Sequence, residues 1–329
     1  MAKMLTEKLS LTCDRLLSHR QLACCYSYFS IPQHGKEVLP LILTGHHGDI
    51  SALTFGKRSS PVILCSASAD YVIVWDIELC QKRTQEGKVA AGTVIGTLLG
   101  EVVHLSFCFS DARVAACTGA TACILSSKRP ETIHTLTGHL GPVTSAEFCP
   151  WNNNILVTTS EDRTFRVWDL KTEAVFFQSF VLSASPLLTT YFLEEDRHLI
   201  TGSTDGQVWC FSLSDDHKCH LVTKMDLEKM EKRHQMHRET VRCVLKLSAV
   251  ETSKPVLKMA LCSWFCIGSS DGLYVVDLAT SELVTALYFK GRLLGTCLLP
   301  SFCLSLRNSG MPPIKHVFSP ERFHWSFLF

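Results

Sequence analysis

An excess of charge of one sign is missing from this 329-residue chain. Thirty-two Lys and Arg side chains are balanced by 31 Asp and Glu, which leaves a formal net charge of +1. A surface that binds a nucleic-acid backbone or anionic lipid needs concentrated positive charge. The composition therefore predicts neither a nucleic-acid partner nor a membrane partner.

Long apolar runs and secretion signals are also missing. The longest apolar stretch, Leu293 to Leu306, is interrupted by Pro300 and is too short to span a bilayer. Residues 1–20 alternate charged and apolar side chains, whereas a secretory signal needs an uninterrupted apolar region, and no Asn-x-Ser/Thr sequon occurs. We expect a protein of the cytosol or the nucleus that is not secreted.

The 16 cysteines have neither metal-ligand spacing nor the spacing of a disulfide framework. No Cys-x-x-Cys pair occurs, and the nearest patterns are Cys24-Cys25, Cys262-x3-Cys266 and Cys219-His220. Others lie singly in or beside strand-like runs, as small buried apolar residues do: Cys65, Cys108, Cys117, Cys149, Cys210 and Cys243. We predict free thiols, no metal and no cofactor, in keeping with a reducing compartment.

The stretch from Leu136 to Leu170 contains strand-like runs separated by turn signals. One β-rich run ends at Ser160, the polar residues 161–164 follow, and a second run begins at Phe165. Two strands joined by a short polar turn predict a β-hairpin. An earlier apolar run, at Val143 and the residues after it, predicts a further strand of the same unit.

Four polar side chains of this stretch have spacings that suit one hydrogen-bonded network. The Asp162 carboxylate can accept from the His139 imidazole, and the Thr158 hydroxyl can link that imidazole to the Trp168 indole. A buried polar group without a partner costs about 1–3 kcal/mol, so such a network has to be complete. Gly138-His139 at the start and Trp168-Asp169 at the end complete the pattern, which resembles the WD-repeat family.

The resemblance implies an all-β fold, a WD-repeat β-propeller, and brings no catalytic residues. A second unit has the candidate network His46, Ser66, Asp70 and Trp75. Its tryptophan follows the aspartate by five residues, where the first unit has six, which predicts a hairpin turn one residue shorter. We interpret both sets of four residues as structural networks that hold their blades together.

Three further units keep only part of the pattern. Residues 92–129 have the length of a blade, but Glu101 replaces the histidine and no turn aspartate follows Thr118, so we expect packing alone to hold it. Residues 182–213 keep the turn aspartate Asp205 and have Phe211 at the tryptophan position. Residues 240–289 keep Asp271 and lose the tryptophan.

The remaining segments set the expected domain bounds. Residues 22–43 look like part of another blade, with a strand over 38–43, and residues 218–239 suggest a charged surface loop rather than a short helix. We expect an N-terminal segment over 1–21, propeller blades over 22–291 and an atypical aromatic tail over 292–329. About five to six blades would form an incomplete or open ring, whose exposed strand edges predict a marginally stable, association-prone protein.

Residues 21–290 are similar in sequence to the N-terminal half of a longer WD-repeat protein, for example in Gly138-His139-Leu140-Gly141-Pro142. The tail over 292–329 is not similar to that protein, which implies that this chain is a shortened or alternatively spliced form. Because the polar residues of each blade are used to hold it together, we predict a non-catalytic protein–protein interaction scaffold. Its partners would be other proteins bound by rim loops, with no small-molecule substrate.

Two alternatives remain. Residues 156–171 are similar to the box that docks some WD-repeat proteins on an adaptor of a cullin-RING ubiquitin ligase, with Lys171 in place of the usual Arg. Residues 268–272 fit the Gly-x-Ser-x-Gly elbow of serine hydrolases, with Ser270 as nucleophile. That elbow needs a helix after the turn, whereas residues 273–276 have the pattern of a strand and Gly202-Ser203-Thr204-Asp205-Gly206 repeats the turn one unit earlier.

Overall fold

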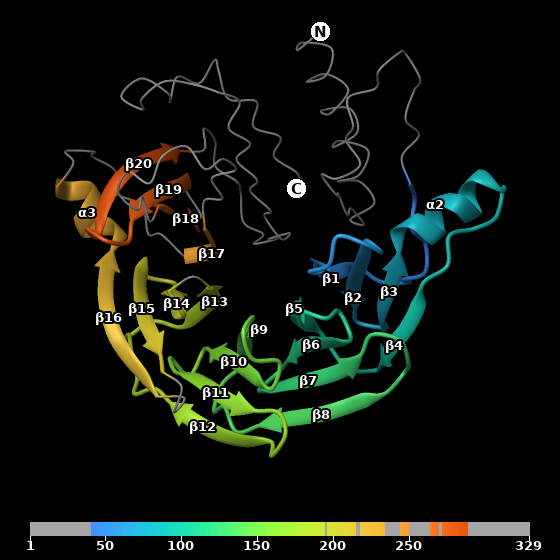
Figure 1. Ribbon diagram of the computed structural model, residues 1–329, viewed down its shortest axis with the longest axis horizontal. Helices are drawn as coiled ribbons and strands as arrows, with labels where there is room; N and C mark the ends of the chain where they lie inside the picture. Colours follow the sequence, from blue (N-terminus) through green and yellow to red (C-terminus); the bar gives the residue numbers. More distant parts are fainter. Residues whose placement is uncertain are drawn as a thin grey trace, which may run out of the picture.

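The computed structural model of the protein describes residues 41–194, 196–214, 218–233, 244–249, 264–269 and 272–288. These residues form five four-stranded antiparallel sheets, each built from strands that follow one another in sequence. We call the sheets blades 1 to 5 in chain order (Figure 1). The prediction of an all-β fold with propeller-like blades is confirmed.

The bounds of the elements are as follows. Blade 1 has β1 (Ile50–Phe55), β2 (Ile63–Ser68), β3 (Tyr71–Asp76) and, after α2 (Ile77–Gln85), β4 (Thr93–Thr97). Blade 2 has β5 (Val102–Phe107), β6 (Arg113–Thr118), β7 (Thr121–Ser126) and β8 (Thr132–Thr137). Blade 3 has β9 (Val143–Phe148), β10 (Ile155–Ser160), β11 (Phe165–Asp169) and β12 (Ala174–Gln178). Blade 4 has β13 (Leu187–Leu193), β14 (His198–Ser203), β15 (Gln207–Leu213) and β16 (Cys219–Asp226), followed by α3 (Leu227–Arg233). Blade 5 has β17 (Val244–Ala249), β18 (Trp264–Ser269), β19 (Gly272–Asp277) and β20 (Glu282–Tyr288).

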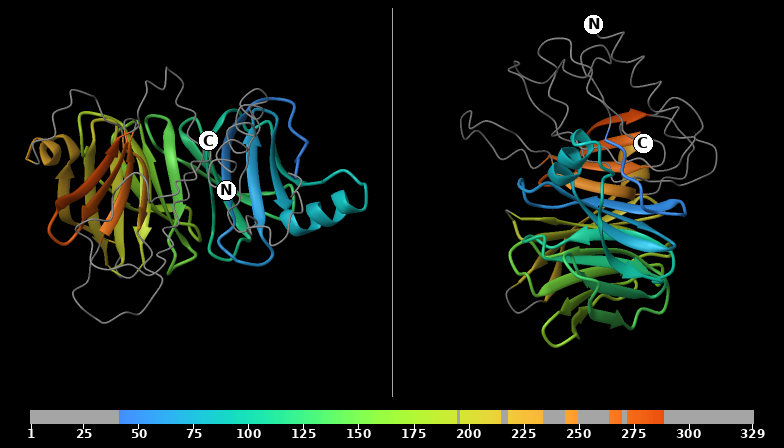
Figure 2. Two further views of the ribbon diagram at one scale, coloured as in Figure 1. Left: turned by 90° about the horizontal axis from the view of Figure 1, so that it is seen from above. Right: turned by 90° about the vertical axis from the view of Figure 1, so that its right-hand side faces the viewer.

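The blades follow one another along an arc, with the first strand of each blade inside and the fourth outside (Figure 1). The inner strands contact one another in sequence, from β1 to β5, β9, β13 and β17. Among the described residues, blades 1 and 5 lie at the two ends of this arc. Helix α2 projects from blade 1 toward the outside (Figure 2).

The core lies between the blades. Apolar side chains from facing sheets form one cluster between each pair of neighbours, for example around Leu156 and Trp168 between blades 2 and 3. The middle strands are therefore covered on both faces, and every residue of β10 and β11 is buried. This two-sided burial explains why these strands have continuous apolar runs instead of the alternation of a half-exposed sheet.

Every outer strand carries a β-bulge opposite the third strand of its blade. In each case the extra residue is a large apolar one, namely Ile95, Ile133, Phe176, Val222 or Val284. A bulge interrupts the hydrogen-bonding ladder and twists an exposed edge away from further strands. The outer strands of the blades therefore carry a feature that opposes edge-to-edge pairing.

Three sequence interpretations of boundaries were wrong. Residues 41–43 are not a strand; Leu41 and Leu43 pack as an irregular segment against the core of blade 1, and residues 22–40 lie outside the described residues. Residues 93–97, assigned to the unit over residues 92–129, form the outer strand of blade 1. Residues 218–239 were interpreted as a surface loop rather than a helix, whereas residues 219–226 form the outer strand of blade 4 and residues 227–233 form α3. In the strand, Met225 is buried and Lys224 Nζ lies 5.3 Å from the centroid of the Trp209 ring.

Helix α2 was not predicted, although its ends carry sequence signals. The Asp76 carboxylate accepts a hydrogen bond from the Leu79 amide at 2.9 Å and so caps the first turn. Glu78 lies in the first turn and Lys82 and Arg83 in the last, which suits the helix dipole. No helix within the described ranges is long and apolar enough to cross a membrane. The segments expected at 1–21 and 292–329 lie outside the described residues.

Candidate functional site

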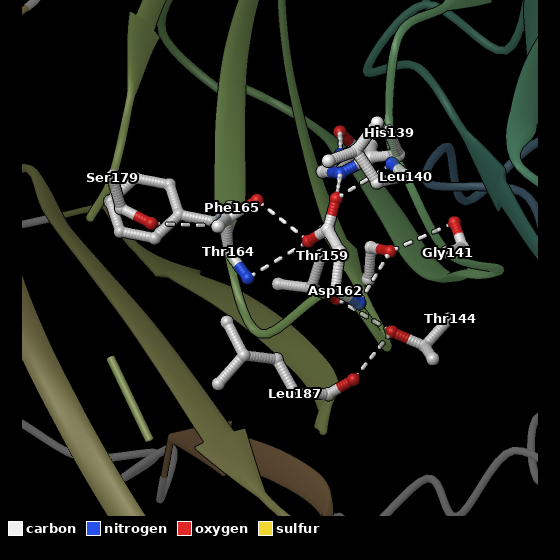
Figure 3. A network of polar contacts seen from close by, with 12 residues as sticks. His139, Leu140, Gly141, Thr144, Thr159, Asp162, Thr164, Phe165, Ser179 and Leu187 are labelled. Atoms are coloured by element: carbon white, nitrogen blue, oxygen red, sulfur yellow. Dashed lines mark hydrogen bonds and ion pairs between the residues drawn. The ribbon is translucent and has the colours of Figure 1, made fainter. Parts of the chain in front are cut away.

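The four network residues of blade 3 come from three different elements. His139 lies in the connection from β8 to β9, Thr158 on β10, Asp162 in the turn after β10, and Trp168 on β11. The β10–β11 register pairs Leu156 with Trp168 and so places the indole near the Thr158 hydroxyl. The structure brings all four side chains together, and Figure 3 shows His139 beside Asp162.

Hydrogen bonds connect the four side chains in a single chain. The Trp168 indole N–H donates to Thr158 Oγ1 at 2.8 Å, and Thr158 Oγ1 lies 2.8 Å from His139 Nε2. His139 Nδ1 lies 2.7 Å from Asp162 Oδ2. Because the indole can only donate and an ionised carboxylate can only accept, the neutral imidazole carries its proton on Nδ1 and accepts from the Thr158 hydroxyl at Nε2.

Asp162 has its acceptor capacity filled. Oδ1 accepts from the Thr164 amide at 3.0 Å and the Thr164 hydroxyl at 2.7 Å, while Oδ2 accepts from His139 and from the Leu140 amide at 3.0 Å (Figure 3). Burial by itself would raise the pKa of Asp162, but the hydrogen bonds from Thr164, His139 and Leu140 hold it below its ordinary value. The carboxylate therefore stays ionised and ties the turn to the loop before β9.

At the His139 imidazole, unlike at Asp162, the effect of burial on the pKa outweighs that of the hydrogen-bond partner. Its side chain is 1% exposed, and this burial holds the pKa of His139 below its ordinary value, although the Asp162 carboxylate acts in the other direction. The positive charge of Arg166 adds to the lowering. The network therefore contains a neutral histidine and a charged aspartate at neutral pH.

Blade 1 repeats the network with a serine in place of the threonine. The Trp75 indole donates to Ser66 Oγ at 2.9 Å, Ser66 Oγ lies 2.7 Å from His46 Nε2, and His46 Nδ1 lies 3.2 Å from Asp70 Oδ1. His47 adds its backbone amide, which donates to Asp70 Oδ2 at 2.8 Å. The turn is one residue shorter than in blade 3, since the last pair is Ala67 with Val72 here and Thr159 with Phe165 there.

The Asp70 carboxylate is held ionised in the same way. Burial would raise the pKa of Asp70, but hydrogen bonds from the His47 amide, His46 and the Tyr71 amide hold it well below its ordinary value. The two networks thus share one arrangement, a charged aspartate that gathers the donors of a loop and a turn.

Blades 4 and 5 keep smaller parts of the arrangement. Asp205 accepts from Ser183 Oγ at 3.0 Å and also from Ser203 Oγ, and Thr201 Oγ1 donates to the Thr189 carbonyl at 3.0 Å. Phe211 occupies the tryptophan position opposite Leu199 and is buried. Asp271 and Ser270 lie outside the described residues; strands β18 and β19 lie on either side of them in the sequence.

The expectation that packing alone holds blade 2 was wrong. The Thr118 hydroxyl donates to the Leu99 carbonyl at 2.8 Å, and the Thr121 hydroxyl donates to the Thr118 carbonyl at 2.9 Å. Thr118 therefore joins the β6–β7 turn to the loop before β5, in the place where a histidine and an aspartate meet in blade 3, and Thr121 closes the turn. Glu101 is exposed.

Hydrogen bonds between blades were missed by sequence reasoning. Asp111 of blade 2 accepts from the Lys57 and Arg58 amides of blade 1 at 2.7 and 3.0 Å. The Thr144 hydroxyl of blade 3 donates to the Leu187 carbonyl of blade 4 at 2.8 Å (Figure 3). No local signal reveals these contacts, because the partners lie 43 to 54 residues apart in the sequence.

The cysteine side chains that the structure describes are free, and most are buried as small apolar residues. Burial raises the pKa of the Cys149 and Cys210 thiols to about 11, and it raises the pKa of Cys65 and Cys117 as well. Cys24, Cys25, Cys243 and Cys262 lie outside the described residues. Within the described part of the chain, no group of His, Cys, Asp and Glu side chains is arranged to hold a metal ion.

Comparison with known families identifies the stretch around this network. Residues 130–169 match the family model described as WD domain, G-beta repeat. Residues 130–169 are therefore a WD repeat. The repeat contains β8 of blade 2 and β9 to β11 of blade 3, so one sequence repeat contributes strands to two neighbouring blades.

Several known proteins are similar to parts of this chain. WD repeat and FYVE domain-containing protein 1 of Homo sapiens is 28% identical over 45% of this chain and 34% of its own length. Protein tipD of Dictyostelium discoideum is 30% identical over 39% of this chain and 19% of its own length. The ribosome biogenesis protein WDR12 homolog of Nematostella vectensis is 25% identical over 51% and 38%. The chain spans less than two fifths of the length of each of these relatives.

Proposed function

We propose that the protein is a non-catalytic scaffold that binds other proteins through one rim of its blades. The observation that carries the proposal is the exposure of large apolar side chains in three of the loops that lead from an outer strand to the next inner strand. Leu98 is 90% exposed, Leu140 92% and Phe180 72%. Exposed apolar side chains grouped on one face mark protein interaction sites.

The polar turns hold these loops in place. The Leu98 amide donates to the Asp70 carbonyl at 3.3 Å, and the Ser160 hydroxyl donates to the Gly141 carbonyl at 3.0 Å. The loop of Phe180 is held by the hydrogen bond from Ser183 to Asp205. This rim thus combines fixed loops with exposed apolar side chains. Because the loops are already held in place, less conformational entropy is lost on binding.

Affinity purification with mass spectrometry tests this function. Leu98→Asp and Leu140→Asp place a charge on the rim, and we expect each to lose proteins that the parent chain captures. Phe109→Asp is the matched control, because Phe109 is 59% exposed in the β5–β6 connection at the opposite rim. Identical sets of captured proteins from all four chains would contradict the proposal.

A cullin-RING ligase receptor is the second candidate function. The observation that favours it is the exposure of Lys171 next to Asp169, whose carboxylate accepts from the Lys171 amide at 3.0 Å and from the Thr172 hydroxyl at 2.8 Å. If this segment docks on the ligase adaptor, Lys171→Arg should strengthen adaptor binding, since Arg supplies the planar fork that Lys lacks. Pull-down with purified adaptor measures this, and equal absence of binding in both chains rules the candidate out.

The resemblance to the N-terminal half of a longer protein supports the proposal that this chain is a shortened form of a WD-repeat scaffold. We place it in the cytosol or the nucleus, and the ribosome biogenesis proteins among the relatives favour the nucleus. The distant alternative, a hydrolase with Ser270 as nucleophile, is tested by a serine-directed covalent probe. Labelling that disappears in Ser270→Ala would overturn the scaffold proposal.

A further inference from the structure

Arg166 on β11 is a buried residue whose guanidinium has no carboxylate partner among the described residues. Its side chain is 9% exposed, and its Nε is buried without a partner. The guanidinium lies over the Trp168 ring, with Cζ 5.8 Å from the ring centroid. That stacking offers no acceptor to the N–H groups, and an unpaired buried cation opposes folding.

The other blades show that folding does not need a charge at this place. Arg166 pairs with Thr158 in the β10–β11 register, and the corresponding residues of the other blades are Ile73, Cys123, Trp209 and Tyr274. All four are uncharged, and they are exposed by 6% or less. Blade 1 has a complete polar network beside an isoleucine, so the network of blade 3 does not require the arginine.

The Asp162 carboxylate, in the turn before β11, is already engaged. Both oxygens of Asp162 accept two hydrogen bonds each, from Thr164, His139 and Leu140. The charge of Arg166 still acts on its surroundings, since it adds to the effect of burial in lowering the pKa of His139.

The guanidinium lies against the loop that carries the exposed Leu140. Gly138 has φ 142°, and a Cβ at this position would collide with Arg166 Nη1, so glycine leaves the space that the guanidinium fills. Leu140 follows two residues later and is 92% exposed. The guanidinium of Arg166, on β11, therefore lies against the loop of the rim that carries this exposed apolar side chain.

We propose that Arg166 anchors a carboxylate-binding site at this junction, and that its ligand is an Asp or Glu side chain of a partner protein whose neighbouring apolar residue covers Leu140. The planar guanidinium matches the two oxygens of a carboxylate, and its attraction for them is strengthened by low local dielectric. The site rests on the proposed scaffold function and names the chemistry of the partner that the rim selects.

Thermal melts of the full chain with short peptide probes test the site. The probe is acetyl-Glu-Leu-amide, its uncharged counterpart is acetyl-Gln-Leu-amide, and inorganic phosphate tests the other common anion. We expect the melting temperature of the parent chain to rise saturably with the Glu peptide alone. Arg166→Met should melt at or above the parent temperature, because it removes an unpaired buried charge, and should bind the Glu peptide roughly tenfold or more weakly.

Arg113→Met is the matched control. Arg113 also lies over an aromatic ring, with Cζ 5.7 Å from the Phe148 centroid, but its Nη2 donates to the Asn153 carbonyl. This variant should keep the response to the Glu peptide. If Arg166→Met does not fold, Arg166→Lys serves instead and should bind the Glu peptide more weakly than the parent, because it keeps the charge and lacks the fork.

Several outcomes would overturn the proposal. These are no response of the parent chain to the Glu peptide, an equal response of Arg166→Met, or a larger response to phosphate that depends on Arg166. Protein capture separates this failure from failure of the scaffold function. If Leu140→Asp loses partners that Arg166→Met retains, the rim binds proteins and the carboxylate site is wrong.

Discussion

Blades 2 and 3 share a strand plan and a common core, yet the same region is held by different chemistry in each. Blade 3 has Thr158 and Trp168 in a hydrogen-bonded chain, and blade 2 has the fully buried Ala116 and Leu125 at the equivalent pairs. Blade 2 joins its turn to the preceding loop with the Thr118 hydroxyl instead. The blade therefore needs its turn and loop to be connected, and a complete network is one of several ways to connect them.

The largest effect is expected where blade 3 depends on its tryptophan. Trp168→Ala removes the 3% exposed indole from the core between blades 2 and 3 and leaves Thr158 without its donor. We expect the free energy of unfolding to fall by about 3–5 kcal/mol, mainly from the cavity. Urea denaturation measures it. Trp168→Leu, which copies blade 2, should cost less, and equal losses from both variants would show that cavity volume does not set the effect.

Loss of the turn aspartate should have an intermediate effect. Asp162→Ala leaves the buried His139 Nδ1–H without an acceptor and frees the Thr164 and Leu140 amides, at a cost of about 1–3 kcal/mol. Asp70→Ala in blade 1 removes the equivalent acceptor and should cost a similar amount. Urea midpoints of the two variants compare the networks directly, and an unchanged midpoint for Asp162→Ala would mean that this network does not stabilise the fold.

Blade 2 should lose less stability when the hydrogen bond that replaces the network, from the Thr118 hydroxyl, is removed. Thr118→Val deletes one hydrogen bond to the Leu99 carbonyl and preserves the shape of the side chain, so we expect a loss of about 0.5–1.5 kcal/mol. Calorimetric melting is a suitable measurement. A loss as large as that of Asp162→Ala would show that blade 2 relies on its single hydroxyl as much as blade 3 relies on its aspartate.

The smallest expected effect is that of mild acid, which should weaken blade 3 through His139 and Asp162, the two titrating members of its network. The pKa values of His139 and Asp162 are lower in the folded chain than their ordinary values of 6.5 and 3.8, so the unfolded chain takes up protons first as pH falls. Their stabilising contribution is therefore complete above pH 6.5 and is lost progressively below it, first from His139 and then from Asp162. Urea midpoints at pH 7.5 and 5.5 should differ more in the parent than in His139→Gln, and an equal change in both would contradict this.

The parts of the fold that the sequence predicts are those with local partners. The networks of blades 1 and 3 each lie within one stretch that includes a hairpin, so residue spacing predicts them. Outer strand β16 was mistaken for a loop because it is half exposed and carries Lys224 and Asp226 among its apolar residues. The acceptor role of Asp111 and the buried charge of Arg166 depend on neighbours brought by other strands or blades, which no local pattern contains.

The separation of folding residues from binding residues is tested most directly by measuring stability and protein capture on the same two variants. Asp162→Ala should lower the urea midpoint and, at a temperature where it remains folded, capture the same proteins as the parent chain. Leu140→Asp, at a side chain 92% exposed, should keep the parent midpoint and lose captured proteins. The opposite pattern, with an unchanged midpoint and lost capture for Asp162→Ala, would show that the polar network is itself a binding site.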